Sequence, residues 1–379
     1  MVLAMSSFVV TLLGLCRCFK FNGKFYLLGT IGILVICFLI LGKIQITIMD
    51  IFILFNPIFV LGNKNDLYPW MTCLYYIAAW MAYFVIRNPK DLKRVLKIVV
   101  IFSSINVLIN LVNIYIPQIY FKAVKILLKS SALSDINYYY QTNGFISGLS
   151  DHYSRNAYFC VAGATVFAAM LFADQKWKKC SVIGLFVNIF MIMIIGKRGH
   201  LLFLAVSLVY VFILKAPNIS QKMMNLLKLV IIAGIATGIM VEMVPSVTYV
   251  FERFTFQQNS GDISTGRFFL WATALKLFKQ KPLFGWGYGY FNTHIKNDFL
   301  NVYFAGVHND YLQWLCELGI IGFIFNIIPM LGIYALSIKE FKEIIRYKDV
   351  VAQENKVLII WSVLFQTFVI LYSLTGLPH

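Results

Sequence analysis

The chain has 379 residues, of which 60% are hydrophobic and 13% are charged. Soluble globular domains carry about 25% charged residues, so this composition excludes a soluble fold. The formal net charge is +17, but the Lys and Arg residues fall in short clusters between apolar stretches. Membrane topology explains most of this excess, and anionic lipid headgroups or a phosphate-bearing lipid substrate are further candidates, so no nucleic-acid partner is expected.

Apolar stretches long enough to cross a bilayer, about 20 residues each, recur along almost the whole chain. We predict eleven membrane spans, at residues 3–16, 25–42, 44–62, 67–86, 98–116, 156–172, 181–196, 199–214, 229–244, 311–336 and 357–376. The first span has no basic region or cleavage site before it, which favours a membrane helix over a cleaved signal. The predicted fold class is all-α, a polytopic integral membrane protein of about 11 to 12 transmembrane helices, with residues 1–379 forming a single membrane domain.

Basic residues indicate the orientation of these spans. Four clusters, within residues 87–97, 176–179, 215–228 and 339–356, fall on one side of the predicted bilayer. That side should be cytoplasmic, because cytoplasmic loops are enriched in Lys and Arg. The N-terminus is then inside, although Arg17, Lys20 and Lys24 run against the trend. Two long segments, a first outer loop at 118–155 and a large outer catalytic loop at 245–310, are placed outside together with the short turn at 197–200.

The large outer loop is too long to be a simple connection, since loops of more than about 15 residues are usually functional or disordered. Within it, Thr265 can cap an amphipathic helix over residues 266–280, which we expect at the membrane interface. One face of this helix carries Trp271, Ala274, Leu275 and Phe278.

A glycine-rich segment follows this helix. Pro282 ends the helix, and Gly285, Gly287 and Gly289 permit a tight turn back toward the bilayer. The spacing is not that of a nucleotide-binding loop, because no strand precedes it and no Gly-Lys-Ser/Thr follows it. The cysteines lack ligand spacing and the outer acidic residues are scattered, so we predict no metal site and no cofactor.

Four of the eight arginines, Arg155, Arg198, Arg253 and Arg267, fall on the outer side, where topology does not explain them. Arg198 lies in a tight turn between two spans, where a charge is costly without a partner, and a guanidinium matches phosphate oxygens. Arg267 starts the loop helix, whose N-terminus also favours an anion. Arg155 could converge on the same anion. The alternatives are an ordinary arginine at a helix end for Arg198 and a topological anchor for Arg155.

His308 is the best candidate for a catalytic base, because an imidazole with a pKa near 6.5 is largely neutral and can accept a proton from a hydroxyl. The alternative interpretation is that His308 is a structural histidine. Glu317 follows nine residues later, which would place it on the opposite face of a helix from His308. Because Gln313 and Glu317 are four residues apart, we expect an internal polar contact that fixes this helix.

Taken together, these motifs resemble the O-antigen polymerase and O-antigen ligase superfamily of bacterial surface-polysaccharide assembly. The resemblance covers roughly residues 144–322 and rests on Arg198, Gly199, Gly266, Arg267, Trp271, Pro282, Leu283, Gly285, Gly287, Gly289, Phe291, His308, Asn309, Tyr311, Leu312, Glu317, Gly319 and Gly322. The segment 148–156, with His152 and Tyr153, is similar to capsule and O-antigen polymerases, which favours a polymerase over a ligase. Relatives often continue through one more helix beyond the closing segment 374–378.

The resemblance implies a membrane glycosyltransferase, similar to the GT-C kind, that needs neither metal nor cofactor. It would join undecaprenyl-pyrophosphate-linked repeat units at the outer face of the bacterial plasma membrane, with inversion at the anomeric carbon. The catalytic residues it implies are His308 as the base and Arg198 and Arg267 as pyrophosphate ligands. Further residues are expected to bind substrate (Arg155, His152, Tyr153, Asn309, Trp271) or to support the site (Glu317, Gly285, Gly287, Gly289).

The expected partners are the lipid-linked glycan donor and acceptor and the membrane lipids, and a flippase and a chain-length regulator are compatible with this interpretation. Two alternatives stay open. A ligase would transfer finished glycan to a lipid A core or to a protein. A flippase or transporter for lipid-linked sugars is suggested by the many spans and by the charges at Asp50 and Glu317, but the chain shows no paired pattern of broken helices in its two halves.

Overall fold

The structure, a computed structural model, describes residues 89–128, 130–173, 178–215, 266–287, 289–297, 302–304, 306–346 and 353–376, with single positions between 218 and 224. The spans predicted at 3–16, 25–42, 44–62, 67–86 and 229–244 lie outside the described residues, as do Arg253 and Thr265.

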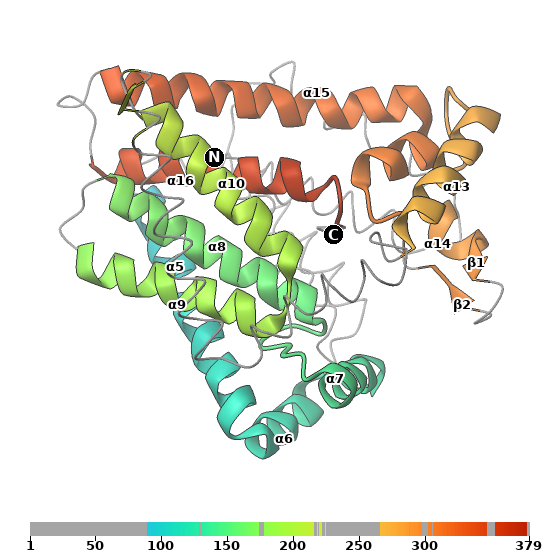
Figure 1. The fold of residues 1–379 in the computed structure, drawn as a ribbon, viewed down its shortest axis with the longest axis horizontal. Helices are drawn as coiled ribbons and strands as arrows, with labels where there is room; N and C mark the ends of the chain where they lie inside the picture. The colour runs from blue at the N-terminus through green and yellow to red at the C-terminus, as the bar shows by residue number, and fades with distance from the viewer. Residues whose placement is uncertain are drawn as a thin grey trace, which may run out of the picture.

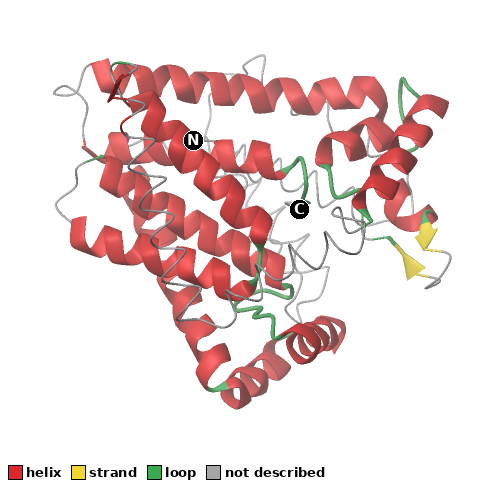
Figure 2. Cartoon of the chain, viewed as in Figure 1, coloured by secondary structure: helices red, strands yellow, loops and turns green. Residues whose placement is uncertain are grey.

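Within the described part, six helices are long and apolar enough to cross a membrane. They are α5 (Pro89–Tyr115), α8 (Tyr153–Phe172), α9 (Lys178–Ile195), α10 (Arg198–Lys215), α15 (Asp310–Arg346) and α16 (Gln353–Tyr372). Each overlaps one of the predicted spans, and Figure 2 shows that helices dominate the fold. The all-α polytopic class is therefore confirmed, while the count of about 11 spans stays a prediction.

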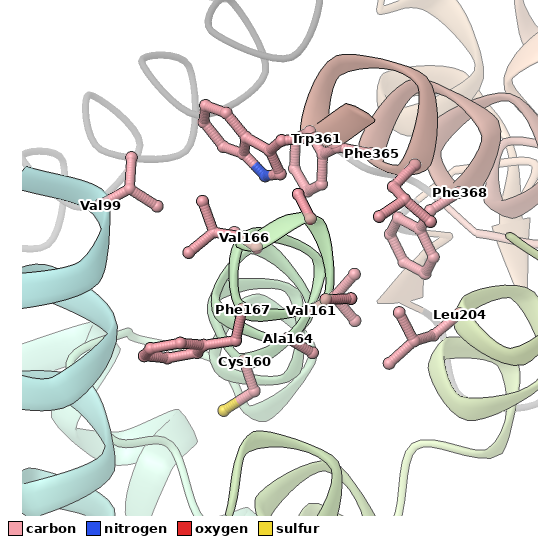
Figure 3. Packing of buried hydrophobic residues seen from close by; sticks show 14 of the residues in the cluster. Val99, Cys160, Val161, Ala164, Val166, Phe167, Leu204, Trp361, Phe365 and Phe368 are labelled. Atoms are coloured by element: carbon pink, nitrogen blue, oxygen red, sulfur yellow. The ribbon is translucent and has the colours of Figure 1, made fainter. Parts of the chain in front are cut away.

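Helix α8 lies in the middle of the bundle and is contacted by α5, α9, α10 and α16 (Figure 1). Its residues from Asn156 to Ala169 are all buried. Figure 3 shows the side chains of Val99, Leu204 and Trp361, from three neighbouring helices, arranged around it. Small residues on α8 permit this close approach, which is how membrane helices gain packing energy without a hydrophobic driving force between them.

Buried asparagines connect α8 to α5. The Asn156 side chain accepts hydrogen bonds from Asn106 (3.0 Å) and Asn110 (3.2 Å) and donates to the Asn110 amide oxygen (2.7 Å). It also donates to the carbonyl of Ile146 at 2.8 Å, in the loop before α8. A Cβ on Gly148 would lie 2.4 Å from the Asn110 oxygen, so only glycine fits there. These contacts fix the loop that leads into α8.

The first outer loop contains two helices that the sequence analysis did not anticipate, α6 (Pro117–Leu127) and α7 (Ser130–Asn143). Figure 1 shows them on one side of the bundle, after the end of α5. Pro117 is at the first position of α6, where its missing N–H is not needed. The Tyr120 hydroxyl donates to the Gly148 carbonyl at 2.9 Å, which ties α6 to the loop before α8.

The large outer loop forms a small subdomain under one end of α15 (Figure 1), with α13 (Arg267–Gln280), α14 (Tyr290–His294) and an antiparallel pair, β1 (Lys296–Asn297) and β2 (Val302–Tyr303). The predicted helix at 266–280 is confirmed, and its N-cap is Gly266 in the left-handed conformation. The predicted apolar face is partly wrong. Leu270 and Ala274 are buried, whereas Leu275 is 41% exposed, because the contact with α15 falls one position earlier along the helix.

We expect Asn156→Ala to lower the free energy of unfolding by about 2 kcal/mol, because it removes buried hydrogen bonds to α5 and to the Ile146 carbonyl. Thermal unfolding of the purified protein in detergent measures the change. Ser104→Ala is the control, since Ser104 is exposed and bonds only within its own helix. Equal melting temperatures for both variants would show that the asparagine contacts add no stability.

Candidate active site

Helix ends from three distant parts of the chain meet at one end of the bundle. The Asp310 amide at the start of α15 donates to the Ser373 carbonyl just after α16 (2.9 Å), and the Tyr311 hydroxyl donates to the Ile370 carbonyl (2.8 Å). The Lys197 ammonium, between α9 and α10, lies 4.1 Å from the centroid of the Tyr153 ring at the start of α8. The segments predicted to share the outer face therefore contact one another.

Helix α15 is broken at Gly319, where φ is 67° and ψ is −172°. The glycine-rich segment satisfies the backbone groups that the break exposes. The amides of Trp286 and Gly287 donate to the carbonyls of Cys316 (3.2 Å) and Glu317 (2.8 Å). In return, the amides of Ile320 and Ile321 donate to the carbonyls of Pro282 (2.8 Å) and Leu283 (3.3 Å).

These hydrogen bonds form a joint between residues 282–287 and the break in α15, and glycine is required on both sides of this joint. A Cβ on Gly285 would lie 2.4 Å from the carbonyl group of Glu317, and a Cβ on Gly319 would lie 2.3 Å from the Leu283 carbonyl oxygen. Both glycines also have a φ of 67°, which L side chains rarely adopt. Gly287 and Gly289 have positive φ as well, so the predicted tight turn through this run is present.

The Glu317 carboxylate is almost fully buried and accepts two backbone hydrogen bonds, from Gly289 (2.9 Å) and from Phe291 (3.0 Å) at the start of α14. The Gln313 amide donates to the same carboxylate at 3.4 Å, which is the contact predicted from their spacing. The Gln313 oxygen in turn accepts from the Val307 amide (3.3 Å). Glu317 therefore links the glycine-rich segment to the residue that precedes His308.

His308 has a φ of 56°, in the left-handed region that few residues other than glycine adopt. Such backbone strain persists where the surroundings fix it, and it is common at active sites. Among the described residues, no hydrogen bond to its ring is found. Burial lowers the pKa of His308 to about 4, with the charges of Arg267 and Lys197 adding to the effect and Asp310 opposing it. The imidazole is neutral at neutral pH and can accept a proton.

Two of the predicted phosphate ligands begin helices at this end of the bundle. Arg267 is the first residue of α13, and its charge acts on His308. In the described part of the chain, no hydrogen bond or ion pair to the Arg267 guanidinium is found. Arg198 is the first residue of α10 and is partly buried. The structure therefore brings Arg267 toward His308. At the start of α10, the charge that acts on His308 is that of Lys197, the residue before Arg198.

The predicted substrate-binding residues around the start of α8 have protein partners of their own. Arg155 forms an ion pair with Asp151. The Nδ1 atom of His152 accepts a hydrogen bond from the Ser154 amide (3.1 Å), so the proton of the neutral ring is on Nε2. Burial, with the charges of Lys197 and Arg155, lowers the pKa of His152 to about 4. His152 can therefore donate a hydrogen bond from Nε2 but is not arranged as a base.

Asn309 and Trp271 differ in what they offer a ligand. The side-chain oxygen of Asn309 accepts from the Leu312 amide (3.0 Å) and so caps α15, which gives Asn309 a structural role. The indole N–H of Trp271 is buried, and among the described residues it has no hydrogen-bond partner. Trp271 lies one turn after Arg267, so the first turns of α13 carry an indole N–H and a guanidinium for which no hydrogen-bond partner is found among the described residues.

Residues 183–327 match the family model described as O-antigen ligase. The resemblance to the O-antigen polymerase and ligase superfamily is confirmed. The match extends from α9 through the glycine-rich segment and the Gly319 break, and it supports a membrane enzyme of the O-antigen ligase and polymerase type. No curated protein matches the chain.

Three residues of the candidate site were not assigned from the sequence. Lys197 and Asp310 each adjoin an assigned residue, and their charges act on His308. Tyr372 is buried at the end of α16, where its ring lies 4.3 Å from that of His200. Adjacency to Arg198 could have pointed to Lys197, whereas only the folded structure brings the end of α16 to this site.

We expect Glu317→Ala to accelerate hydrogen exchange at the Gly289 and Phe291 amides by a factor of ten or more, because two buried donors lose a charged acceptor that is worth about 1–3 kcal/mol to each. Hydrogen exchange measured by mass spectrometry on peptides that contain Gly289 and Phe291 reports the change. Thr293→Val is the control, because the Thr293 hydroxyl hydrogen-bonds to the carbonyls of Gly289 and Tyr290 and to Nδ1 of His294, all within α14 and its N-cap. Unchanged exchange at these amides would mean that Glu317 does not hold the segment.

Proposed function

We propose that this protein is a polysaccharide polymerase that joins undecaprenyl-pyrophosphate-linked oligosaccharide repeat units at the outer face of the bacterial plasma membrane. One observation carries the proposal: a neutral, strained His308 lies within the influence of Arg267 and Lys197, inside the segment that matches the O-antigen ligase family. A neutral base beside cations is what a transfer reaction from a pyrophosphate needs.

The proposed reaction is a single displacement. A ring nitrogen of His308 takes the proton of an acceptor sugar hydroxyl, and the hydroxyl oxygen forms a bond to the anomeric carbon of the donor. The bond from that carbon to the pyrophosphate oxygen breaks, and its electron pair leaves with the lipid pyrophosphate. Arg267 and Arg198 stabilise the negative charge on the leaving group, an effect that is strong where water is excluded. The anomeric configuration inverts, as expected for a GT-C-like enzyme without metal.

The segment before α8 favours a polymerase over a ligase, because its pattern resembles that of capsule and O-antigen polymerases. This segment is fixed by contacts with neighbouring helices: the Asn110 side chain lies against Gly148, and the Tyr120 hydroxyl donates to the Gly148 carbonyl. The segment leads into His152 and Tyr153, which lie next to Lys197. A ligase that transfers finished glycan to a lipid A core or to a protein is the alternative. The two differ in product, since only a polymerase lengthens the lipid-linked glycan.

A flippase or transporter is less well supported. Transporters use broken helices whose free backbone groups bind the substrate. Helix α15 is broken at Gly319, but the segment 282–287 accepts and donates the hydrogen bonds that the break leaves open. Those backbone groups are therefore engaged by the protein itself. In the proposed setting a separate flippase would supply the lipid-linked units, and a chain-length regulator would limit the product.

The direct test is a reconstituted reaction that uses purified protein, lipid-pyrophosphate-linked repeat units and no added metal, with products resolved by length. We expect a ladder of products, and a loss of rate of at least about 10²-fold in His308→Ala, the usual contribution of a general base. Arg198→Ala and Arg267→Ala should lose the ladder as well.

His294→Ala is the matched control, because His294 is an exposed histidine at the end of α14 that stacks on Tyr290. It should retain the ladder. Transfer of glycan to an added acceptor without a ladder would establish a ligase. Movement of glycan lipids between leaflets without any new bond would rule out an enzyme of this kind.

The dependence of kcat/KM on pH should reflect the lowered pKa of His308. The base must be unprotonated, so activity is present above its pKa and is lost as the pH falls through about 4. We expect a constant kcat/KM between about pH 8 and pH 5, whereas an ordinary imidazole would give a decline near pH 6.5. Initial rates in nanodiscs across this range measure the profile. A midpoint near 6.5 would mean that the surroundings of His308 do not suppress its protonation.

A further inference from the structure

Lys197 occupies a fixed position between two membrane-spanning helices. Gly196, with a φ of 77°, ends α9, and its amide donates to the Met193 carbonyl at 2.9 Å. The Lys197 carbonyl accepts from the Leu201 amide (3.3 Å) in the first turn of α10. Both helices therefore determine where the Lys197 side chain starts, and it starts at the end of the bundle that carries His308.

The Lys197 ammonium lies over the face of Tyr153, 4.1 Å from the ring centroid. The Tyr153 ring stacks on Phe145 with centroids 4.4 Å apart, and its centroid is 4.3 Å from that of His152. The face of an aromatic ring attracts a cation. The aromatic cluster thus holds the charge next to the segment that precedes α8.

The charge of Lys197 acts on both histidines of the site. It is among the causes that lower the pKa of His152 and that of His308, after burial in each case. Arg267 acts on His308 from α13, a distant part of the chain. Among the described residues that act on these two histidines, three cations (Lys197, Arg155, Arg267) accompany two carboxylates (Asp151, Asp310), and Asp151 is paired with Arg155. The region around His308 therefore favours an anion.

We propose that Lys197 is a further substrate-binding residue, whose ammonium binds an anionic oxygen of the lipid-linked substrate between Tyr153 and His308. This inference rests on the proposed function, since it names a ligand contact at the same site. Two sources share this chemistry: a phosphate of the lipid pyrophosphate and a carboxylate of an acidic sugar.

The test compares Lys197→Met, which keeps the length of the side chain and removes its charge, with Lys197→Arg, which keeps the charge. Lys215→Met is the matched control, because the Lys215 ammonium also lies over an aromatic ring, that of Phe172 at 5.9 Å, at the opposite end of α10. Binding of a polyprenyl pyrophosphate that carries a neutral sugar, and of one that carries a uronic acid, is measured on the full chain in nanodiscs. Melting temperatures of all variants are measured beside it.

We expect Lys197→Met to weaken binding about tenfold or more, the change that the loss of one charge-assisted contact produces, and Lys197→Arg to restore much of it. Lys215→Met should bind as the wild type does. A loss with both probes identifies a phosphate as the partner, and a loss with the uronic acid probe alone identifies a carboxylate.

Wild-type affinity in Lys197→Met for both probes would overturn the proposal, and so would a loss that Lys197→Arg does not relieve. The polymerase proposal fails separately: in that case the wild-type protein binds a probe but produces no ladder. Binding and polymerisation therefore give independent outcomes for the two inferences.

Discussion

A helix that breaks inside a membrane protein exposes backbone N–H and C=O groups, and without water each unsatisfied group costs several kcal/mol. At Gly319 these groups are satisfied by the segment 282–287, whose own amides and carbonyls are satisfied in the same exchange. The Glu317 carboxylate then holds the next turn of chain through Gly289 and Phe291. Because α13 ends just before this joint and α14 begins just after it, the position of the whole outer subdomain depends on one break in α15.

The joint also determines which charges approach His308. Helix α13 packs against α15, and Arg267 at its start acts on His308, while the turn before α10 brings Lys197 from the bundle side. Desolvation keeps the imidazole neutral, and the nearby cations oppose its protonation. In the proposed reaction, burial serves two purposes, since it keeps the base unprotonated and strengthens the attraction between the cations and an anionic ligand.

Hydropathy was sufficient to predict the six described spans, because a bilayer demands apolar segments of a fixed length. Local rules also predicted the contact between Gln313 and Glu317 and the turn through the glycines. Helices α6 and α7 were missed because they are too short to span a bilayer and pack against α5 and against each other. The ion pair of Arg155 and the helix cap formed by Asn309 could not be predicted either, because both depend on neighbours whose geometry appears only in the folded chain.

Gly285 and Gly319 are separated by more than thirty positions in the sequence, yet neither has room for a methyl group, because the backbone of the segment that carries the other glycine lies against it. Neither position can accept a side chain unless the opposite segment of the joint moves, and such a move would break the hydrogen bonds between the two segments. We therefore expect the two glycines to be kept or lost together in evolution. A lineage that loses one of them must rebuild the crossing altogether, while exposed surfaces elsewhere remain free to diversify.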